Sequence, residues 1–345
     1  MFVLIDNHHA QLTYSLELLF GKRLGYKVVY PMGLEWYEKG YWNVYPHPAT
    51  AESYLGLARA DKTAHSKEFL MTGSGIEKPD PRLHYHWDST KGIYERGVAL
   101  ETFKQLPVAF LVASMPVHAE SYGELIQKYQ PASKLIFQMG NNFQEFHFQS
   151  VKNVLNSTQR KIPFWIRSVS YNQEFDLGVF KYEPPRNNRL IVNLTHYMSN
   201  AEYFNAVKSF LPQHRMESYG AGNETGSIAR TADVADKMKE ADFIWHLKHE
   251  DGYGHVLHNA AALGRPVIIS KNQYRKLRFG KFIEDGVTCI DVDGLSAEGL
   301  AKKIRHFGEP ERLERMSKAL YQRFRDLVDF DRDERNVRRF LAGLR

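Results

Sequence analysis

Short apolar runs alternate with longer amphipathic stretches along the chain, a pattern typical of an α/β protein. Buried strands are predicted in the first half of the chain at residues 2–5, 27–30, 107–113, 134–137, 153–156 and 164–167. Amphipathic helices are predicted between them at 12–24 and 119–129. A strand, a helix and a second strand in succession favour a parallel sheet, because the helix returns the chain to the edge where the first strand began.

A stiff polar segment separates this series from a second one. Residues 180–188 contain two consecutive prolines followed by Arg-Asn-Asn, and such a run is typical of a linker. A second series of strands and helices then begins. We therefore expect two Rossmann-like domains, 1–182 and 189–310, whose parallel sheets face each other across a cleft.

The second half contains the most informative stretch of the chain. Its pattern predicts a buried strand at 242–247, a polar turn, a helix at 254–263 and a further strand at 267–269. Gly252 and Gly254 flank the start of the helix, where backbone N–H groups have no intrahelical partner and the helix dipole favours an anion. A phosphate group would fit at this helix start.

The two faces of the predicted helix differ in character. On a helical wheel the apolar residues gather on one half, while the other half carries His255, His258, Asn259 and Ala262. We expect the apolar half to pack on the sheet and the polar half to face solvent or a ligand.

This stretch resembles the donor-binding segment of GT-B glycosyltransferases, above all those of family 4. That segment has an acidic residue, Gly-aromatic-Gly, four further residues, a second Glu, and then Ala-x-Ala-x-Gly-x-Pro-Val. The matching positions of this chain are Asp251, Gly252, Tyr253, Gly254, Asn259, Ala260, Ala262, Gly264, Pro266 and Val267. The chain departs from the family at Asp251, where Glu is usual, and at Asn259, which replaces a Glu that binds the ribose.

The resemblance implies an α/β enzyme of the GT-B fold that uses a UDP- or GDP-linked sugar and needs neither a metal nor another cofactor. It implies that Asp251, or Glu250 beside it, binds hydroxyls of the donor sugar. Asn259 would meet the ribose through its amide. The backbone expected to meet the donor phosphates is that of Gly252, Tyr253, Gly254 and His255.

Cations for the donor diphosphate are expected at unusual positions. Family-4 enzymes usually place an Arg and a Lys after the first strand of the second domain, but the turn 193–200 has neither. Lys248, Lys271 and Arg275 lie near the predicted ends of neighbouring strands. We expect Lys248 and at least one of the other two to contact the diphosphate. The alternative is an ordinary solvated basic surface.

Three histidines of the first half lie where parallel sheets bind ligands. His8 and His9 follow the first predicted strand, where inverting GT-B enzymes often place a catalytic base. His118 follows the strand predicted at 107–113 and is a candidate for the family-4 histidine that often touches the donor sugar. In that family the histidine more usually follows the next strand, where this chain has Met139-Gly-Asn-Asn142. Each could accept a proton from the acceptor hydroxyl or bind a ligand. His8 and His9 could instead be ordinary loop residues, and retention or inversion at the anomeric carbon stays open.

Composition adds two constraints. A formal charge of +6 over 345 residues favours an anionic ligand or surface. Cys289 is the single cysteine, so no intrachain disulfide forms, and we expect a cytoplasmic protein that is either free or peripheral to a membrane. No run approaches the roughly 18 apolar residues of a membrane span.

Several functions are compatible with these features. The acceptor could be a surface glycan or lipid-linked sugar at a membrane face, or a hydroxymethylated base in DNA, as in phage-type DNA glucosyltransferases of GT-B architecture. The alternatives are a GT-B-shaped nucleotide-sugar epimerase and a non-catalytic nucleotide-sugar binding module, which Asn259 and the missing Arg and Lys allow. No obligate protein partner is indicated. Family precedent also predicts that the C-terminal helix within 311–345 packs back on the first domain.

Overall fold

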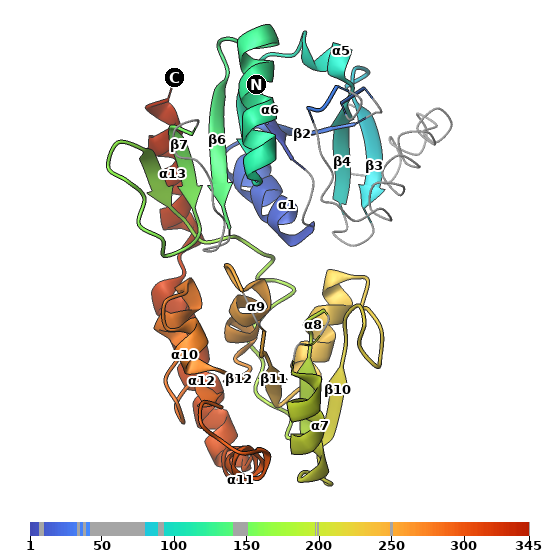
Figure 1. The fold of residues 1–345 in the computed structure, drawn as a ribbon, viewed down its shortest axis with the longest axis vertical. Coiled ribbons are helices and arrows are strands. Elements are labelled where there is room, and N and C mark those ends of the chain that lie inside the picture. The colour runs from blue at the N-terminus through green and yellow to red at the C-terminus, as the bar shows by residue number, and fades with distance from the viewer. Residues whose placement is uncertain are drawn as a thin grey trace. The chain divides into compact units, whose positions relative to one another are not determined.

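The protein is described from a computed structural model that divides into two compact units (Figure 1). The described residues are 1–6, 10–32, 35–36, 39–41, 80–88, 93–140, 151–196, 198, 200–248 and 251–344. Unit 1 comprises Met1–Glu174 and Asp331–Arg345, and unit 2 comprises Phe175–Phe330.

The segment expected to be a linker belongs to unit 2. Phe175 and Phe180 are buried in the core of that unit, with ring centroids 5.6 Å apart. Tyr182 stacks on Tyr321 at 4.5 Å. The prolines and polar residues of 180–188 are typical of a linker, but the aromatic side chains beside them anchor this stretch. Unit 2 therefore begins at Phe175.

In the described part of unit 1, eight strands form one sheet in the order β3-β4-β2-β1-β5-β6-β7-β8. The strands are β1 (Phe2–Ile5), β2 (Lys27–Pro31), β3 (His84–Asp88), β4 (Ile93–Val98), β5 (Val108–Ala113), β6 (Lys134–Met139), β7 (Asn153–Asn156) and β8 (Arg167–Ser170). Neighbouring strands are parallel except β3 and β4, which are antiparallel. The helical segments are α1 (Ala10–Leu16), the π-helical η1 (Glu17–Arg23), α5 (Leu100–Phe103), α6 (Pro116–Tyr129) and α13 (Phe330–Ala342).

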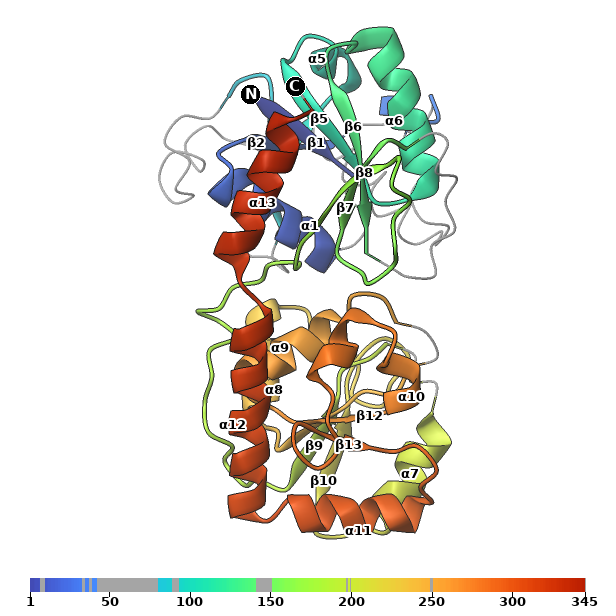
Figure 2. The same ribbon diagram turned by 90° about the vertical axis from the view of Figure 1, so that its left-hand side faces the viewer.

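Helices cover both faces of this sheet (Figure 2). Phe2 and Leu4 of β1 share a core with α6, whereas Val3 and Ile5 share a core with α1, η1 and α13. Successive strand residues point to opposite faces, so a strand between two helical layers needs apolar residues at every position. This explains the continuous apolar run at the start of the chain.

The last strand of unit 1 begins later than predicted. The apolar pattern predicts a strand at 164–167, but Phe164 and Trp165 are exposed and β8 begins at Arg167. Ile166 is the apolar residue of this run that enters the core. The predicted start of this strand is therefore wrong, because Phe164 and Trp165 lie in a surface turn.

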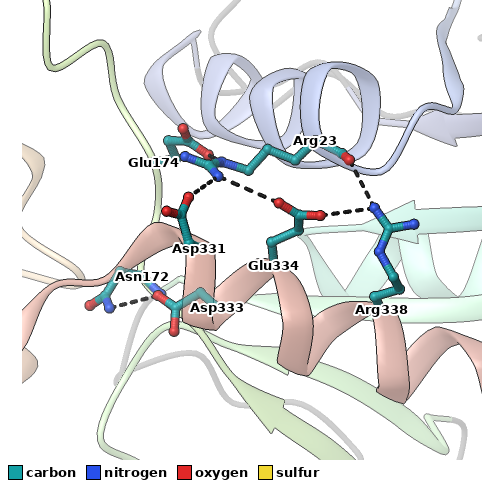
Figure 3. A network of polar contacts seen from close by, with 7 residues as sticks. All are labelled: Arg23, Asn172, Glu174, Asp331, Asp333, Glu334 and Arg338. Carbon is teal, nitrogen blue, oxygen red and sulfur yellow. Dashed lines mark hydrogen bonds and ion pairs between the residues drawn. The ribbon is translucent and has the colours of Figure 1, made fainter.

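A polar network fastens α13 to unit 1. Its members are Arg23, Asn172, Glu174, Asp331, Asp333, Glu334 and Arg338 (Figure 3). Arg23 of η1 forms ion pairs with Asp331 at 2.7 Å and with Glu334 at 3.5 Å. Asn172 donates to Asp333 from its backbone at 2.8 Å and from its side chain at 2.7 Å. These contacts hold the C-terminal helix against segments more than 150 residues earlier in the chain.

In the described part of unit 2, five strands form a parallel sheet in the order β10-β9-β11-β12-β13. The strands are β9 (Leu190–Asn193), β10 (Arg215–Ser218), β11 (Phe243–Trp245), β12 (Val267–Ile269) and β13 (Cys289–Asp291). The helical segments are α7 (Ala201–Ser209), α8 (Thr231–Glu240), α9 (His255–Leu263), α10 (Lys271–Tyr274), the 3-10 helix η2 (Arg278–Phe282), α11 (Ala297–Phe307) and α12 (Pro310–Leu327). Helices α8, α9 and α12 share a core with one face of the sheet, and α7 and α11 share a core with the other.

Two glycines set the limits of α9. Gly254 caps its start and Gly264 caps its end, and both have the left-handed backbone that favours glycine. A Cβ atom on Gly264 would lie 2.6 Å from the Tyr182 ring and 2.8 Å from Ser317 Oγ. This position therefore excludes a side chain on two grounds, backbone conformation and space.

The C-terminal region holds two helices, and they belong to different units. Helix α12 packs on α9 of unit 2, and α13 belongs to unit 1 from Asp331 onward. Among the described helices, none is long and apolar enough to cross a bilayer.

Candidate functional site

Polar residues gather at the carboxyl ends of the parallel strands of unit 2. Asn193 closes β9, His246 follows β11 and Ser270 follows β12. Open parallel sheets bind their ligands at this edge. The predicted donor-binding segment leaves the sheet here, directly after β11.

Asp251 lies at the centre of a buried network on this edge. His246 Nε2 lies 2.8 Å from Asp251 Oδ2, and the Tyr274 hydroxyl donates to the same oxygen at 2.9 Å. The backbone N–H of Gly252 donates to Oδ1 at 3.0 Å, and Lys248 Nζ lies 3.5 Å from that oxygen. The carboxylate therefore ties the turn after β11 to the strand itself and to α10.

The pKa values of the pair fit an ionised aspartate beside a neutral histidine. Burial lowers the pKa of His246 and the hydrogen bond to Asp251 offsets only part of that effect. Burial alone would raise the pKa of Asp251, but the contacts with His246, Lys248 and Tyr274 outweigh it and hold that pKa well below its usual range. Because the carboxylate can only accept, Nε2 of His246 carries the proton.

The turn between Asp251 and α9 is held from inside the protein. The Tyr253 side chain is only 2% exposed, and its ring stacks on His258 with centroids 4.1 Å apart and planes 6° apart. His258 Nδ1 lies 2.9 Å from the carbonyl oxygen of Gly254 and donates to it. The side chain of Tyr253 is thus packed, while Gly252 and His255 on either side are half-buried.

Three of the four residues on the polar half of α9, His258, Asn259 and Ala262, are buried, and the expectation that this half faces solvent or a ligand is wrong for His258. Its ring is fully buried and meets Phe279 and Phe282 of η2 edge-on, at 5.3 and 5.2 Å. Burial lowers the pKa of His258 to about 3, so the ring is neutral at physiological pH. A helical wheel shows which residues share a face, but it does not show that a later aromatic segment covers that face.

Two buried acceptor atoms on this face have no hydrogen-bond partner among the described residues. They are Asn259 Oδ1 and His258 Nε2. A buried polar group without a hydrogen-bond partner lowers the stability of the fold by about 1–3 kcal/mol, so the presence of such groups calls for an explanation. Asn259 is the position that the family resemblance assigns to the ribose, and a ligand hydroxyl could donate to its free oxygen.

The predicted cations flank this network. Lys271 and Arg275 lie at the two ends of α10, and both are exposed. The same short helix carries Tyr274, whose hydroxyl reaches Asp251. Lys248 is partly exposed, and its carbonyl accepts a hydrogen bond from the Gln273 side chain. The structure thus brings Lys248, Asp251 and α10 together at one end of the sheet.

The turn after β9, where family-4 enzymes carry an Arg and a Lys, satisfies its own polar groups instead. Asn193 donates to Ser218 Oγ at 2.9 Å and accepts from the Thr195 hydroxyl at 2.7 Å. Asn223 donates to the carbonyl of Thr195 at 2.6 Å. Short polar side chains therefore fix this turn, and any cation for a phosphate must come from elsewhere.

His118 belongs to a separate buried cluster at the carboxyl edge of the unit 1 sheet. Asp6 follows β1, Ser114 follows β5, and His118 lies in the first turn of α6. His118 Nδ1 lies 2.6 Å from Asp6 Oδ2, and the backbone N–H of Ser114 donates to that oxygen at 2.7 Å. The Ser114 hydroxyl donates to Asp6 Oδ1. The His118 ring also stacks on Tyr122, with centroids 6.2 Å apart.

Three predicted site residues, His8, His9 and Glu250, lie outside the described residues. Within the described ranges, no group of three or more His, Cys, Asp and Glu side chains is placed to hold a metal ion. His255 and His258 share one helix, but His258 already donates to the backbone and is enclosed by aromatic rings.

Sequence reasoning missed four residues of these two clusters. They are Asp6, Ser114, His246 and Tyr274. Three of them follow a buried strand directly, so the rule that ligands bind at the carboxyl ends of parallel strands could have found them. Tyr274 carried no such signal, because its role depends on α10 folding back onto the turn.

No protein-family model and no curated protein sequence matches this chain. Among solved structures, HepE of Anabaena in complex with UDP matches with a TM-score of 0.64 and 10% identity over 99% of each chain. The pneumococcal O-GlcNAc transferase GtfA in complex with UDP and GlcNAc matches with a TM-score of 0.62 and 11% identity over 100% of this chain and 99% of its own.

A third match was solved with DNA. An α-glucosyltransferase in complex with UDP-glucose and DNA containing an abasic site gives a TM-score of 0.60 and 10% identity over 99% of each chain. Full-length matches of this kind show that the chain has the GT-B fold, which confirms the fold class predicted from the sequence. At identities this low, the likeness establishes the fold alone.

Proposed function

We propose that this protein is a glycosyltransferase that moves a sugar from a nucleoside-diphosphate sugar to an acceptor hydroxyl. The observation that carries the proposal is the start of α9, where Gly254 caps the helix without help from a side chain and a buried aspartate network holds the preceding turn. The solved structures compared above contain UDP or UDP-glucose, which supports a uridine nucleotide as the donor before a guanosine one.

The start of α9 suits the leaving group of the reaction. When the bond between C1 of the sugar and the diphosphate breaks, negative charge grows on the β-phosphate. Backbone N–H groups of Tyr253–His255 and the helix dipole would stabilise that charge, while the Gly252 N–H stays on Asp251. Gly252 and His255 are half-buried rather than enclosed, so this turn is partly exposed beside the packed Tyr253.

In this mechanism Asp251 is a positioning residue. Its oxygens already accept from His246, Tyr274 and the Gly252 backbone, so its main effect is to hold the turn in the shape that presents the amides. Asn259 would bind a ribose hydroxyl through Oδ1. Lys248 would add charge to the diphosphate, together with Lys271 or Arg275. These groups would supply the positive charge that the leaving group needs, which is the basis for expecting a reaction without a metal ion.

On the acceptor side, His118 of unit 1 is the proposed proton acceptor. Its Nδ1 faces Asp6, so Nε2 is the nitrogen that would take the proton of the attacking hydroxyl. The carboxylate of Asp6 would stabilise the imidazolium that forms. His8 and His9 remain candidates for the same role.

Two acceptor classes remain within the proposal. One is a surface glycan or lipid-linked sugar at a membrane face, and the other is a hydroxymethylated base in DNA. The α-glucosyltransferase solved with DNA shares the fold, which keeps the second class under consideration.

The test is to incubate the protein with UDP- and GDP-linked sugars and to measure free nucleoside diphosphate with and without each acceptor class. Release that depends on an acceptor supports transfer. Isomerisation of the donor without release would instead indicate an epimerase, and binding without turnover a nucleotide-sugar binding module. Absence of both binding and turnover across the panel would refute the proposal.

A matched pair of variants ties the activity to the proposed site. Lys248→Gln should weaken UDP binding about tenfold, which corresponds to the loss of one charge-assisted hydrogen bond. The control is Lys208→Gln. Lys208 is an exposed lysine on α7 whose Nζ lies 3.8 Å from Glu224 Oε2, and its substitution should leave UDP affinity unchanged. Equal effects of the two substitutions would remove Lys248 from the donor site.

A further inference from the structure

We propose that the surface turn at residues 163–166 of unit 1 attaches the protein to the surface of a bilayer that contains anionic phospholipids. The turn carries Phe164 and Trp165 at its tip, between β7 and β8. This interaction surface uses no residue of the donor site, so the proposal can be tested independently of the proposed sugar transfer.

The turn is fixed from both sides. The backbone N–H of Ile166 donates to the carbonyl of Pro163 at 3.0 Å, which closes a four-residue turn around Phe164 and Trp165. Ile166 is buried in the core of unit 1, and Ile162 packs against the same core. The two aromatic residues are therefore held outward by their neighbours.

The degree of exposure is unusual for aromatic side chains. Phe164 is 95% exposed and Trp165 is 69% exposed, the two highest values among the large hydrophobic side chains that the structure describes. Central positions of turns ordinarily carry Gly, Asn, Asp or Ser. Adjacent exposed aromatics at such positions mark an interaction site, and Trp in particular favours the interface between membrane and water.

The charge around the turn complements an anionic surface. Residues 151–173 include Lys152, Arg160, Lys161 and Arg167 and contain no Asp or Glu. Lys161 and Arg167 are exposed on the two flanks of the aromatic tip. Basic residues beside an apolar tip are what peripheral attachment to anionic lipid requires, because charge attracts the protein and aromatic rings enter the headgroup region.

The position of the turn separates it from the candidate catalytic residues of unit 1. β7 and β8 are parallel, and the turn lies directly before β8, at the amino edge of the sheet (Figure 2). Asp6 and Ser114 follow the carboxyl ends of their strands, at the opposite edge. The aromatic tip is therefore an attachment point and not the place where an acceptor meets His118.

The arrangement of the rings favours a bilayer over a nucleic acid. The two rings meet edge to face, with centroids 5.1 Å apart and planes 82° apart. Nucleic-acid bases stack on aromatic faces that lie side by side along a groove. Two rings at 82° to each other do not present such a row of faces, so the geometry does not favour stacked bases.

The test is co-sedimentation of the full chain with vesicles of phosphatidylcholine alone and of phosphatidylcholine with phosphatidylglycerol. We expect binding to the anionic vesicles that weakens with salt, and a loss of at least about tenfold in the double variant Phe164→Ser, Trp165→Ser. The control is Phe210→Ser, which removes an exposed aromatic side chain of unit 2 and should bind as the wild type does.

Two further readouts make the outcome decisive. Brominated lipids should quench the fluorescence of Trp165, so the wild type should lose more emission than Trp165→Phe. UDP affinity should be the same in the double variant and the wild type, which separates attachment from donor binding. The proposal is overturned if the wild type does not bind anionic vesicles, or if the double variant binds them as well as the wild type does. It is also overturned if Phe164 and Trp165 mediate binding to duplex DNA instead.

Discussion

Each unit of the protein contains a buried histidine–aspartate pair at the carboxyl edge of its sheet. The two pairs differ in which of the two residues directly follows the strand. In unit 1 the aspartate, Asp6, follows the strand, and His118 comes from a helix. In unit 2 the histidine, His246, follows the strand, and Asp251 comes from the turn before α9. The ring nitrogen that meets the carboxylate also differs, since it is Nδ1 in His118 and Nε2 in His246.

The additional partners of each aspartate show what each pair does. Ser114 fixes Asp6 through its backbone and its hydroxyl, and both contacts lie within the sheet edge that His118 faces. Asp251 instead joins His246, Tyr274 and the Gly252 backbone, which come from three segments. The pair in unit 1 therefore orients a histidine, whereas the pair in unit 2 shapes a loop. In the proposed function, the same two residue types would serve proton transfer in one unit and anion binding in the other.

The largest effect is expected from Asp251→Ala. The substitution leaves buried polar atoms of His246 and Tyr274 without their acceptor, so the free energy of unfolding should fall by about 3 kcal/mol. The turn should lose its shape, and UDP affinity and turnover should fall by about 100-fold or more. Calorimetric titration with UDP, a turnover assay and urea unfolding measure the three quantities.

Two companion variants separate binding from stability. Asp251→Asn keeps the side-chain volume and one acceptor oxygen, so the variant protein should remain folded. Its affinity for UDP should nevertheless be lower than that of the wild type. Asp236→Ala removes an exposed aspartate of α8 and should change neither quantity. A folded Asp251→Asn protein with wild-type UDP affinity would contradict the role assigned to this pair.

An intermediate effect is expected from Asp6→Asn. The substitution removes the charge that orients His118 and stabilises its protonated form, so kcat should fall by about 10- to 100-fold. UDP affinity should stay within about twofold of the wild type, because no donor contact is lost. Asp80→Asn, which weakens the ion pair of this partly buried aspartate with the exposed Arg82, is the control and should keep the wild-type kcat. Equal losses of UDP affinity in the Asp6 and Asp251 variants would contradict the claim that only the pair in unit 2 shapes the donor-binding turn.

The smallest effect is a loss of stability between pH 7 and pH 5.5 that comes from unit 2. The pKa of His258 falls to about 3 in the folded protein, whereas an unfolded histidine has a pKa near 6.5. The unfolded state therefore binds a proton first as the pH drops, and stability is lost between about pH 6.5 and 3, by up to about 1.4 kcal/mol per pH unit. The lowered pKa of His246 acts in the same direction.

Urea unfolding at pH 7 and at pH 5.5 tests this expectation. His258→Gln should show a smaller loss of stability between the two pH values than the wild type does. His306→Gln, on the exposed surface of α11, should match the wild type. An unchanged pH dependence in His258→Gln would mean that the ring titrates normally and is not enclosed as described.

The sequence predicted the strands and helices around the α9 turn of unit 2 well. It predicted the surroundings of the polar residues at the carboxyl edge of the sheet only in part. Alternating strands and helices and the glycines at 252, 254 and 264 were enough to predict the turn and the limits of α9. The burial of His258 was not predictable, because Phe279 and Phe282 cover it from a segment that a helical wheel does not include. Local patterns determine an element, whereas its surroundings depend on tertiary packing.

The same limit applies to unit 1. His118 was a candidate because it follows a strong strand, but its partner Asp6 lies 112 residues away in the sequence. Phe164 and Trp165 were assigned to a strand on hydrophobicity alone, whereas the structure holds them outward in a turn. Pairing between distant segments and the reason for an exposed aromatic residue are properties of the folded chain.

The central claim is that the backbone at the start of α9 binds the diphosphate of the donor nucleotide. A crystal structure of the protein with UDP tests it most directly. We expect β-phosphate oxygens at about 3 Å from backbone nitrogens between Gly252 and His255, with a ribose hydroxyl on Asn259 Oδ1. A nucleotide bound elsewhere in the protein, with these backbone groups unchanged, would contradict the account.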